Sequence, residues 1–97
     1  MPLDIILAPE AVEDLKALKA NVRTAVRTAI EDHLRHEPRK ARRSRIKRLR
    51  GLEKPQFRLR AGEVRVFYDV SARTVEVLAI VAKSEAKTWL AQSGRPE

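Results

Sequence analysis

Basic side chains dominate one stretch of the sequence, RKARRSRIKRLRG, which runs from Arg39 to Gly51. Eight of its first twelve residues are Lys or Arg, and none is acidic. Such a run can bind the phosphates of a nucleic acid, because each phosphate contact releases condensed counterions. It can equally be a solvated edge strand whose charges prevent edge-to-edge association. The run therefore predicts either an anionic partner or a protected strand edge.

A second group of basic residues lies on two strand-like segments, QFRLR (56–60) and EVRVFYDV (63–70), separated by the dipeptide AG. A two-residue hairpin loop would place Arg58 directly opposite Arg65 on the polar face. Like charges in that position destabilise a ladder by about 0.2–1 kcal/mol. Either nearby carboxylates and water compensate them, or the two guanidinium groups fork onto the oxygens of a phosphate. In the second case the basic residues expected to add to the phosphate site are Lys47, Arg48, Arg50 and Arg60.

Length and composition narrow the classes of function. The 97 residues predict one domain, spanning residues 1–97, with a single modest core. Cysteine is absent, which excludes disulfides, thiolate zinc sites and cysteine nucleophiles, and two histidines make a poor metal site, so no metal or other cofactor is expected. Neither a membrane-spanning segment nor a secretory signal is recognisable, so we expect a cytoplasmic protein. The net charge of +8 favours an anionic partner, either a nucleic acid or an acidic protein segment.

The first third of the chain predicts a strand followed by a helical hairpin. LDIIL, residues 3–7, is a short apolar run with β-branched residues, and Pro9 then suits the first turn of a helix. A second helix is expected from the capping residue Asn21 to just before Pro38. Its apolar residues fall on one face: Val22, Val26, Ala29, Ile30 and Leu34. The short connection between the helices makes them antiparallel neighbours.

The second half of the chain changes to the alternating pattern of strands. TVEVLAIVA, residues 74–82, is apolar at almost every position, so we expect it near the centre of the sheet. The basic run is expected to enter the sheet near Lys47 or through a bulge, because its apolar residues break strict alternation. Ser84 can cap a short last helix that ends at Gly94. The predicted order is strand, helix, helix, three or four strands, and a short helix.

A family resemblance rests on four segments: APEAVEDLKAL near the N-terminus, then KRLRGL, FRLRAGEVRVFYDV and VEVLAIVAKSEAKTWL. Together they cover nearly the whole chain and resemble the RelE/ParE superfamily of toxins from type II toxin-antitoxin pairs. The resemblance implies an α+β fold, in which a small twisted antiparallel sheet carries the N-terminal helical hairpin on one face, with a short C-terminal helix. It also implies an antitoxin that wraps the toxin. The RelE branch implies cutting of messenger RNA in the ribosomal A site, and the ParE branch implies poisoning of DNA gyrase.

The resemblance also implies roles for single residues. Arg58 and Arg65 match basic residues on two strands that RelE-type nucleases use, which makes them the candidate catalytic pair. The RelE pattern continues with an arginine or histidine after the final strand and a tyrosine in the C-terminal helix. Here these places hold Ser84 and Leu90, with Lys83 as the nearest cation and a candidate phosphate ligand. Neither Ser84 nor Leu90 is an acid or base near neutral pH.

Proton transfer is the step for which the sequence offers no convincing residue. RNA cleavage requires deprotonation of a ribose 2′-hydroxyl and protonation of the departing 5′-oxygen. Tyr68 falls on the apolar face of its strand and Trp89 lies beside apolar helix positions, so both are predicted to be core residues. Glu63, next to the hairpin turn, is expected to be solvated or paired with Arg60. The two histidines lie in or near the end of the second helix, where a structural role is favoured.

Three functions therefore remain open. The first is a ribosome-dependent and metal-independent mRNA endoribonuclease, with Arg58 and Arg65 holding the scissile phosphate. The second is a toxin that binds DNA gyrase without cutting nucleic acid. The third is a catalytically weak subunit that acts mainly in antitoxin binding and operator regulation. A cognate antitoxin is the expected partner in each case. The first function adds the ribosome and mRNA as partners. Operator DNA is expected to be bound only through the antitoxin complex, and no membrane is expected as a partner.

Overall fold

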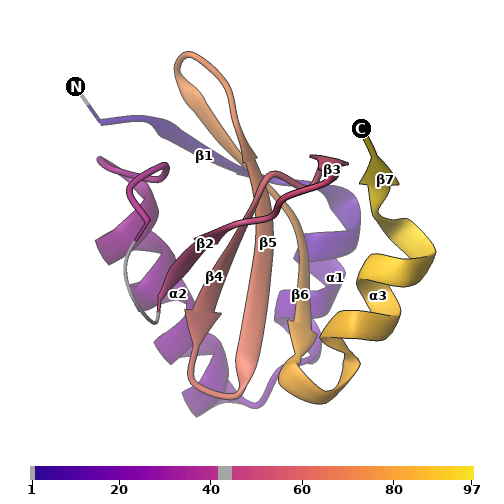
Figure 1. The fold of residues 1–97 in the computed structure, drawn as a ribbon. Helices are drawn as coiled ribbons and strands as arrows, with labels where there is room; N and C mark the ends of the chain where they lie inside the picture. Colours follow the sequence, from indigo (N-terminus) through magenta and orange to yellow (C-terminus); the bar gives the residue numbers. More distant parts are fainter. Residues whose placement is uncertain (1, 42–44) are drawn as a thin grey trace.

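A five-stranded sheet forms the centre of the computed structural model, which describes residues 2–41 and 45–97 (Figure 1). Across the sheet the strands are β1 (Asp4–Leu7), β6 (Thr74–Ala82), β5 (Val64–Val70), β4 (Phe57–Ala61) and β2 (Ile46–Arg48). The predicted α+β class is confirmed, with the long apolar strand β6 in the interior. The sheet is mixed rather than wholly antiparallel, since β1 pairs with β6 in parallel. The two helices that follow β1 provide the crossover that a parallel pair requires.

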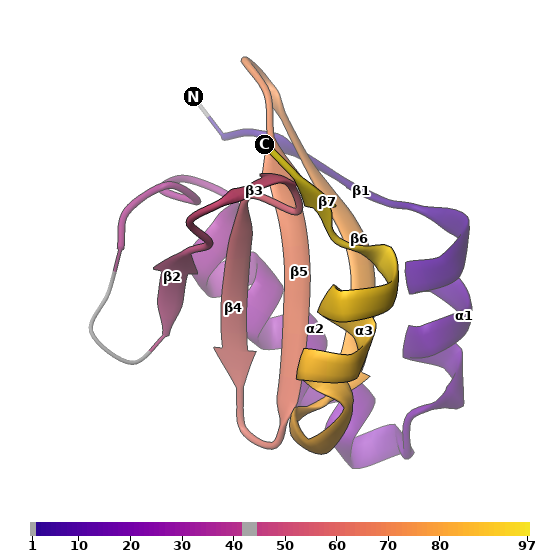
Figure 2. The same ribbon diagram turned by 45° about the vertical axis from the view of Figure 1, so that its right-hand side comes forward.

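Two helices cover one face of the sheet and a third packs on the other. The helical hairpin is formed by α1 (Pro9–Ala17) and α2 (Ala20–Leu34), and the C-terminal helix is α3 (Ala86–Ser93). Figures 1 and 2 show the hairpin behind the sheet and α3 in front of its β5 and β6 side. We call the face opposite the hairpin the open face, because α3 covers only part of it. No helix in the described ranges is long and apolar enough to cross a membrane.

Two predicted helix caps are wrong, although the helices themselves are present. Lys19 occupies the N-cap of α2, so Asn21 lies in the first turn and caps nothing. Ser84 lies within a short 3-10 turn, Lys83–Glu85, that precedes α3. A capping preference is a weak local signal that the tertiary context of a helix can override. Pro9 is at the start of α1 as predicted.

The main core lies between the hairpin and the sheet. It includes Val26, Ile30 and Leu34 of α2, together with Leu59, Val66, Val75 and Val77 of the strands. Tyr68 is completely buried, its ring stacks on Phe57 with centroids 5.4 Å apart, and its hydroxyl donates to the Pro38 carbonyl at 2.7 Å. Burial raises the pKa of this phenol, so it stays protonated. The prediction that Tyr68 is a core residue is confirmed.

The β4–β5 hairpin has a different register from the predicted one. Its two-residue turn is Gly62–Glu63 instead of Ala61–Gly62, so Ala61 pairs with Val64 and Arg60 pairs with Arg65. Gly62 has φ of +61°, a conformation that glycine adopts without the strain other residues would incur. The pairing is shifted by two residues, which keeps every side chain on its predicted face. Arg58 therefore lies opposite Phe67, not opposite Arg65.

The C-terminal tail forms a small second sheet that the sequence did not predict. Strand β7 (Arg95–Pro96) pairs with β3 (Leu52–Lys54), and Figure 1 shows this pair at the upper end of the open face. Arg95 Nε lies 3.1 Å from Glu53 Oε2, and the Glu97 N–H donates to the Gly51 carbonyl at 3.2 Å. These contacts tie the end of α3 to the segment that follows β2.

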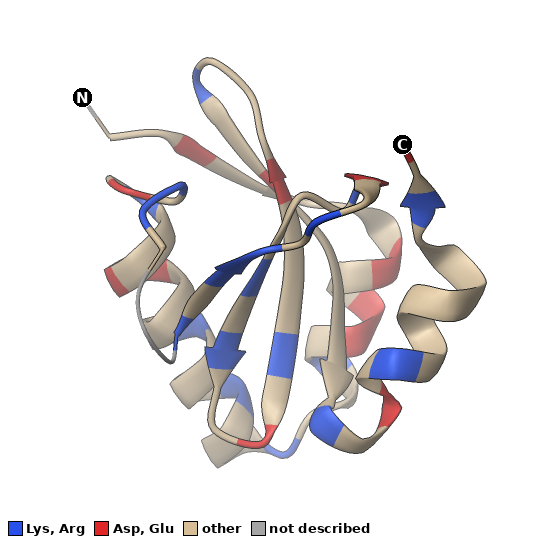
Figure 3. Ribbon diagram, in the orientation of Figure 1, with Lys and Arg blue, Asp and Glu red and all other residues tan. Residues whose placement is uncertain are grey.

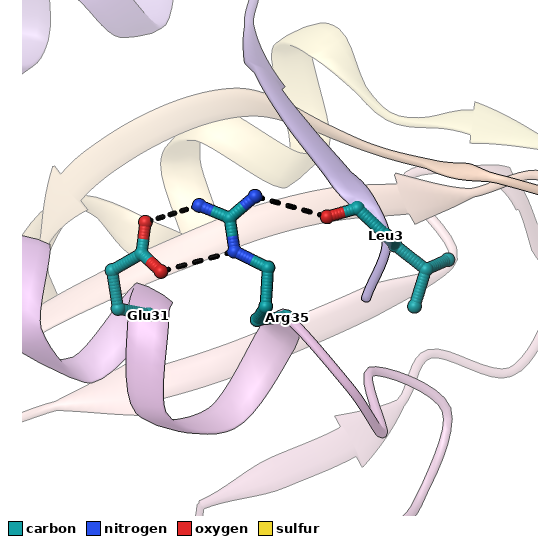
Figure 4. A network of polar contacts seen from close by, with 3 residues as sticks. All are labelled: Leu3, Glu31 and Arg35. Atoms are coloured by element: carbon teal, nitrogen blue, oxygen red, sulfur yellow. Dashed lines mark hydrogen bonds and ion pairs between the residues drawn. The ribbon is translucent and has the colours of Figure 1, made fainter. Parts of the chain in front are cut away.

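Arg35 joins the end of α2 to the beginning of the first strand (Figure 4). Its Nη1 donates to the Leu3 carbonyl at 3.0 Å, and its own carbonyl accepts from the Leu3 N–H at 2.8 Å. Nε and Nη2 of the same guanidinium donate to the Glu31 carboxylate. These hydrogen bonds lower the pKa of Glu31. Leu3 thus has both backbone groups satisfied on its outer side by one helix residue.

Replacing Arg23 by alanine is expected to destabilise the helical hairpin. The Arg23 guanidinium donates to the carbonyls of Leu15, Lys16 and Leu18 at 2.8–3.2 Å, which cap the C-terminal end of α1. Loss of these charged donors should lower the free energy of unfolding by about 2 kcal/mol. Denaturant unfolding of Arg23→Ala beside Arg27→Ala, an exposed arginine one turn later, measures the difference. Equal losses in the two variants would contradict the capping role.

Candidate phosphate-binding site on the open face

Four basic side chains come together on the open face of the sheet. Cross-strand pairing sets Lys47 beside Arg58 and Arg60 beside Arg65. Because side chains two apart on a strand share a face, all four lie on the same side as Phe67. We call Lys47, Arg58, Arg60 and Arg65 the basic cluster. Figure 3 shows the basic segments on the neighbouring strands β2, β4 and β5, with the helical hairpin behind them.

Arg58 lies at the centre of the basic cluster. Its side chain is half-buried, and its Nε is buried without a hydrogen-bond partner among the described residues. Burial lowers the pKa of Arg58, and the charges of Arg65 and Arg60 lower it further. A desolvated cation next to other cations is unfavourable until an anion neutralises it. Arg58 is therefore the donor of the cluster that has most to gain from a bound anion.

Arg65 is tied to the hairpin turn. Only 7% of the residue is exposed, and its Nη1 donates to the carbonyls of Gly62 at 2.8 Å and Val64 at 3.2 Å. The carboxylates that the sequence offered as compensation do not hold it: Asp69 accepts instead from the Gln56 N–H at 2.8 Å. Arg65 combines a structural contact through one nitrogen with a positive charge next to Arg58.

Some of the remaining predicted site residues belong to the basic cluster and others lie outside it. Lys47 and Arg60 are exposed within it. Arg48 lies on the opposite face, with its guanidinium carbon 5.2 Å from the centroid of the Phe57 ring. Arg50 is exposed in the turn after β2, and no described contact joins it to the cluster. The backbone of Lys83 reaches the hairpin turn, where its N–H donates to the Glu63 carbonyl at 2.8 Å.

An aromatic pair lies next to the basic cluster. Phe67, the cross-strand neighbour of Arg58, stacks on Trp89 with ring centroids 4.9 Å apart and an interplanar angle of 7°. Trp89 is half-buried, and its Nε1 donates to Glu10 Oε2 at 2.8 Å. The sequence predicted Trp89 as a core residue, but it packs outside the main core, on the open face. In the sequence, Phe67 is an apolar residue on the otherwise polar face of its strand, and this could have indicated that another apolar side chain covers it on the open face.

Tyr68, Ser84 and His33 do not gather around Arg58 in the described part of the chain. Tyr68 faces the core, and Ser84 is exposed in the turn before α3. His33 belongs to α2, on the far side of the sheet from the basic cluster. The described residues contain no group of three His, Asp or Glu side chains that could hold a metal ion. The arrangement on the open face supplies concentrated positive charge next to an aromatic pair, which is suited to a phosphate-bearing ligand.

One comparison with known proteins identifies a family. Residues 5–86 match the family model described as the ParE toxin of the type II toxin-antitoxin system parDE. A search of curated protein sequences found no relative of the chain.

Solved structures of toxin-antitoxin complexes share the fold. The RelE–RelB complex from Pyrococcus horikoshii matches with a TM-score of 0.69 and 21% identity, over 86% of this chain and 97% of that one. The RelB–RelE complex from Methanococcus jannaschii gives 0.65 and 19%, over 87% and 96%. The RelBE2 complex from Mycobacterium tuberculosis gives 0.62 and 25%, over 84% and 99%. With the family match over most of its length and this fold, the chain belongs to the ParE toxin family, within the RelE/ParE superfamily of type II toxins.

Proposed function

We propose that this toxin is a ribosome-dependent mRNA endoribonuclease whose basic cluster holds the scissile phosphate. The observation that carries the proposal is Arg58, whose buried Nε has no described partner and whose charge is crowded by Arg60 and Arg65. A phosphate on the open face would neutralise the Arg58 guanidinium and offset the repulsion among these charges. In this proposal the whole chain, residues 1–97, acts as one toxin domain in the cytoplasm, where ribosomes and mRNA are found.

Charge stabilisation is the main contribution of the cluster to the reaction. Attack of the ribose 2′-hydroxyl on the adjacent phosphorus forms a bond to the 2′-oxygen, builds negative charge on the phosphorane oxygens and expels the 5′-oxygen. Arg58 and Arg60 would donate to those oxygens, while Lys47 adds charge from the neighbouring strand. Arg65 would hold the hairpin turn and contribute its charge at short range. This scheme uses no cofactor, because the guanidinium groups stabilise the negative charge that develops on the phosphorane oxygens.

The ribosome has a specific part in this proposal. The basic cluster lacks an evident acid or base, so positioning of the 2′-hydroxyl must carry much of the rate. A ribosome that holds the mRNA in an extended A-site conformation would supply that positioning. Free mRNA should then be cut poorly, and the aromatic pair Phe67–Trp89 would border the nucleotide next to the scissile phosphate.

A gyrase-directed toxin is the second candidate, favoured by the ParE family match and by the lack of an evident acid or base in the basic cluster. Two assays separate the candidates. Purified toxin is added to translating ribosomes, where primer extension maps cleavage, and to gyrase with supercoiled DNA and ATP. Cleavage of A-site mRNA with unimpaired gyrase supports the first proposal. Inhibited or DNA-trapped gyrase with intact mRNA would replace it with the second.

A cognate antitoxin is part of the proposal in either case. The similar solved structures are toxin-antitoxin complexes, and the basic cluster is a surface that an acidic segment could cover. We propose that the antitoxin neutralises the toxin by binding and that operator DNA is contacted only through this complex. Coexpression should abolish growth arrest, and a stoichiometric complex that stays fully toxic would contradict neutralisation by binding.

Binding of single-stranded RNA should depend steeply on salt through the exposed members of the basic cluster. Each phosphate neutralised contributes about −0.7 to the slope of log affinity against log salt. The double variant Lys47→Gln/Arg60→Gln should reduce the magnitude of the slope by about 1.4. The control Arg48→Gln/Arg73→Gln removes the same charge from the opposite face and from the β5–β6 turn, and should leave the slope nearly unchanged. Equal slopes for both double variants would place RNA elsewhere, including on Arg42 and Arg43, which lie outside the described residues.

A further inference from the structure

A pocket lies at the upper end of the open face, beyond the basic cluster. Its volume of about 410 Å³ is within the range of sites for small ligands. Its lining includes Ile6, Gln56, Asp69 and Glu76, and cross-strand pairing sets Ile6 beside Glu76 and Glu76 beside Asp69. Figure 3 shows the acidic end of β5 above the basic segments of the sheet. We call this space the upper pocket.

Two backbone hydrogen bonds fix the polar side chains on one side of the upper pocket. Asp69 Oδ1 accepts from the Gln56 N–H at 2.8 Å, and Gln56 Oε1 accepts from the Val70 N–H at 3.0 Å. The second bond sets the orientation of the Gln56 amide, because the flipped amide would place a donor against the Val70 N–H. Asp69 Oδ2 and Gln56 Nε2 have no hydrogen-bond partner among the described residues, so both are available to a ligand.

Glu76 adds a second carboxylate to the pocket from the next strand. Its Oε1 lies 4.0 Å from Lys54 Nζ, so a neighbouring cation moderates its charge. Burial raises the pKa of Asp69, and the Gln56 N–H and the charge of Lys54 oppose this shift. A partly desolvated carboxylate is stabilised by additional hydrogen-bond donors. The pocket therefore favours a ligand that brings N–H groups over one that brings only oxygen atoms.

Across the sheet, the three polar side chains present a donor, an acceptor and a second acceptor. The donor is Gln56 Nε2, next to β4, and the acceptors are the carboxylates of Asp69 on β5 and Glu76 on β6. Among the four RNA bases, only guanine has the complementary Watson–Crick edge, which carries the O6 acceptor followed by the N1–H and N2–H donors. Uracil would place a carbonyl oxygen against Glu76, and adenine and cytosine can satisfy only two of the three groups.

The upper pocket is within reach of a nucleotide whose phosphate lies at Arg58. Asp69 follows Phe67 by two residues, roughly 7 Å along β5, and Phe67 is the cross-strand neighbour of Arg58. Such a nucleotide would extend past the Phe67–Trp89 pair and place its base in the pocket. Ile6 is 51% exposed and is the only large apolar residue so exposed among those described, and it would pack against the base.

We infer that the upper pocket binds a guanine base of the RNA and makes the toxin selective for guanine next to the scissile phosphate. Gln56 Nε2 donates to O6, Asp69 Oδ2 accepts from N1–H, and a Glu76 oxygen accepts from N2–H. Any other base leaves one of these groups without a partner, which is the physical source of the selectivity. The inference rests on the proposed RNA-cleaving function and adds a base preference to it.

Binding of short RNAs tests the base contacts one at a time. Fluorescence anisotropy compares a labelled hexauridine with the same RNA carrying one guanosine, inosine or cytidine. Guanosine should raise the affinity by about tenfold or more, and inosine, which lacks the N2–H donor, should lose most of that gain. Equal affinity for the guanosine and uridine RNAs would overturn the inference and leave the proposed function standing. Failure of the toxin to bind any of these RNAs would remove the phosphate site and the inference with it.

Asp69→Asn should change the preferred base. Its Oδ1 can still accept from the Gln56 N–H, whereas Oδ2 is replaced by an N–H donor. The resulting order of donor, donor and acceptor complements the O2, N3 and N4–H groups of cytosine, so the preference should change from guanosine to cytidine. Glu76→Ala should abolish the difference between guanosine and inosine.

Asp32→Asn on α2 is the matched control, because it makes the same chemical change on the other side of the sheet. It should keep the wild-type preference for guanosine, and thermal melts of the three variants show whether each is folded. A wild-type base preference in both folded pocket variants would contradict the inference.

Ribosome-dependent cleavage and antitoxin binding distinguish the remaining outcomes. On mRNAs that differ only in the A-site codon, cleavage should be fastest with guanosine at one fixed codon position, and Asp69→Asn should prefer cytidine there. Selective binding of guanosine without any cleavage would support the pocket and contradict the nuclease proposal. Weaker antitoxin binding by both pocket variants, with an unchanged base preference, would assign the pocket to the antitoxin and overturn the inference.

Discussion

Replacing Arg58 by glutamine is expected to reduce ribosome-dependent mRNA cleavage by about 10²-fold or more. The change removes the central cation of the basic cluster, whose Nε has no described partner. Because the free protein gains nothing from that charge and Arg65 and Arg60 repel it, stability should be unchanged or higher by up to about 1 kcal/mol. Loss of cleavage together with an unchanged or raised melting temperature is the expected combination.

Arg48→Gln is the matched control for this prediction. It removes the same charge from an adjacent strand, but from the face opposite the cluster, where Arg48 lies over the Phe57 ring. Cleavage by Arg48→Gln should stay within a few fold of wild type. If both variants lost cleavage equally, the effect would come from net charge rather than from the site. If well-folded Arg58→Gln cut mRNA at the wild-type rate, Arg58 would not hold the phosphate.

Replacing Arg65 by glutamine is expected to lower both stability and cleavage. Two hydrogen bonds from Nη1 to the carbonyls of Gly62 and Val64 would be lost, at a cost of about 1–3 kcal/mol. For a domain of this length, that corresponds to a melting temperature lower by roughly 4 °C or more. Cleavage should fall further than the folded fraction alone explains, because a charge next to Arg58 also disappears.

Arg65→Lys separates the two contributions of Arg65. Lysine keeps the charge but loses the planar fork, so part of the turn contact should be lost while most of the local charge remains. Thermal melts and primer extension on both variants measure the result. A glutamine variant that melted at or above the wild-type temperature would contradict the structural contact. In that case relief of the repulsion between Arg65 and the neighbouring Arg58 would outweigh the lost hydrogen bonds.

The sequence was sufficient to predict the strands and helices because their periodicity is strong. It also predicted correctly which side chains of β4 and β5 share a face, since an error of two residues in register does not change the face. The register itself depended on which dipeptide forms the turn. Gly62 prefers the first turn position through its positive φ, whereas placing it second predicted a pairing of Arg58 with Arg65 that does not occur.

The parts that were not predicted are short or depend on distant contacts. Strand β2 has three residues and a basic sequence, so its pattern could not show which of Lys47 and Arg48 lies on the open face. The β3–β7 pair is shorter than any recognisable pattern. The stack of Phe67 on Trp89 joins residues that only the folded chain brings together. The upper pocket likewise depends on strand order, which local pattern does not specify.

The most direct measurement is an NMR titration of the arginine Nε–H signals with a short single-stranded RNA that carries 2′-deoxyribose at one position to prevent cleavage. The account predicts that the Arg58 Nε–H signal shifts most, in a saturable manner that salt weakens, while the Arg48 signal stays unchanged. The same result is expected whether the bound RNA is subsequently cut on the ribosome or only held. Saturable shifts of Arg48 or Arg50 with an unmoved Arg58 signal would contradict the assignment of the phosphate site to the open face.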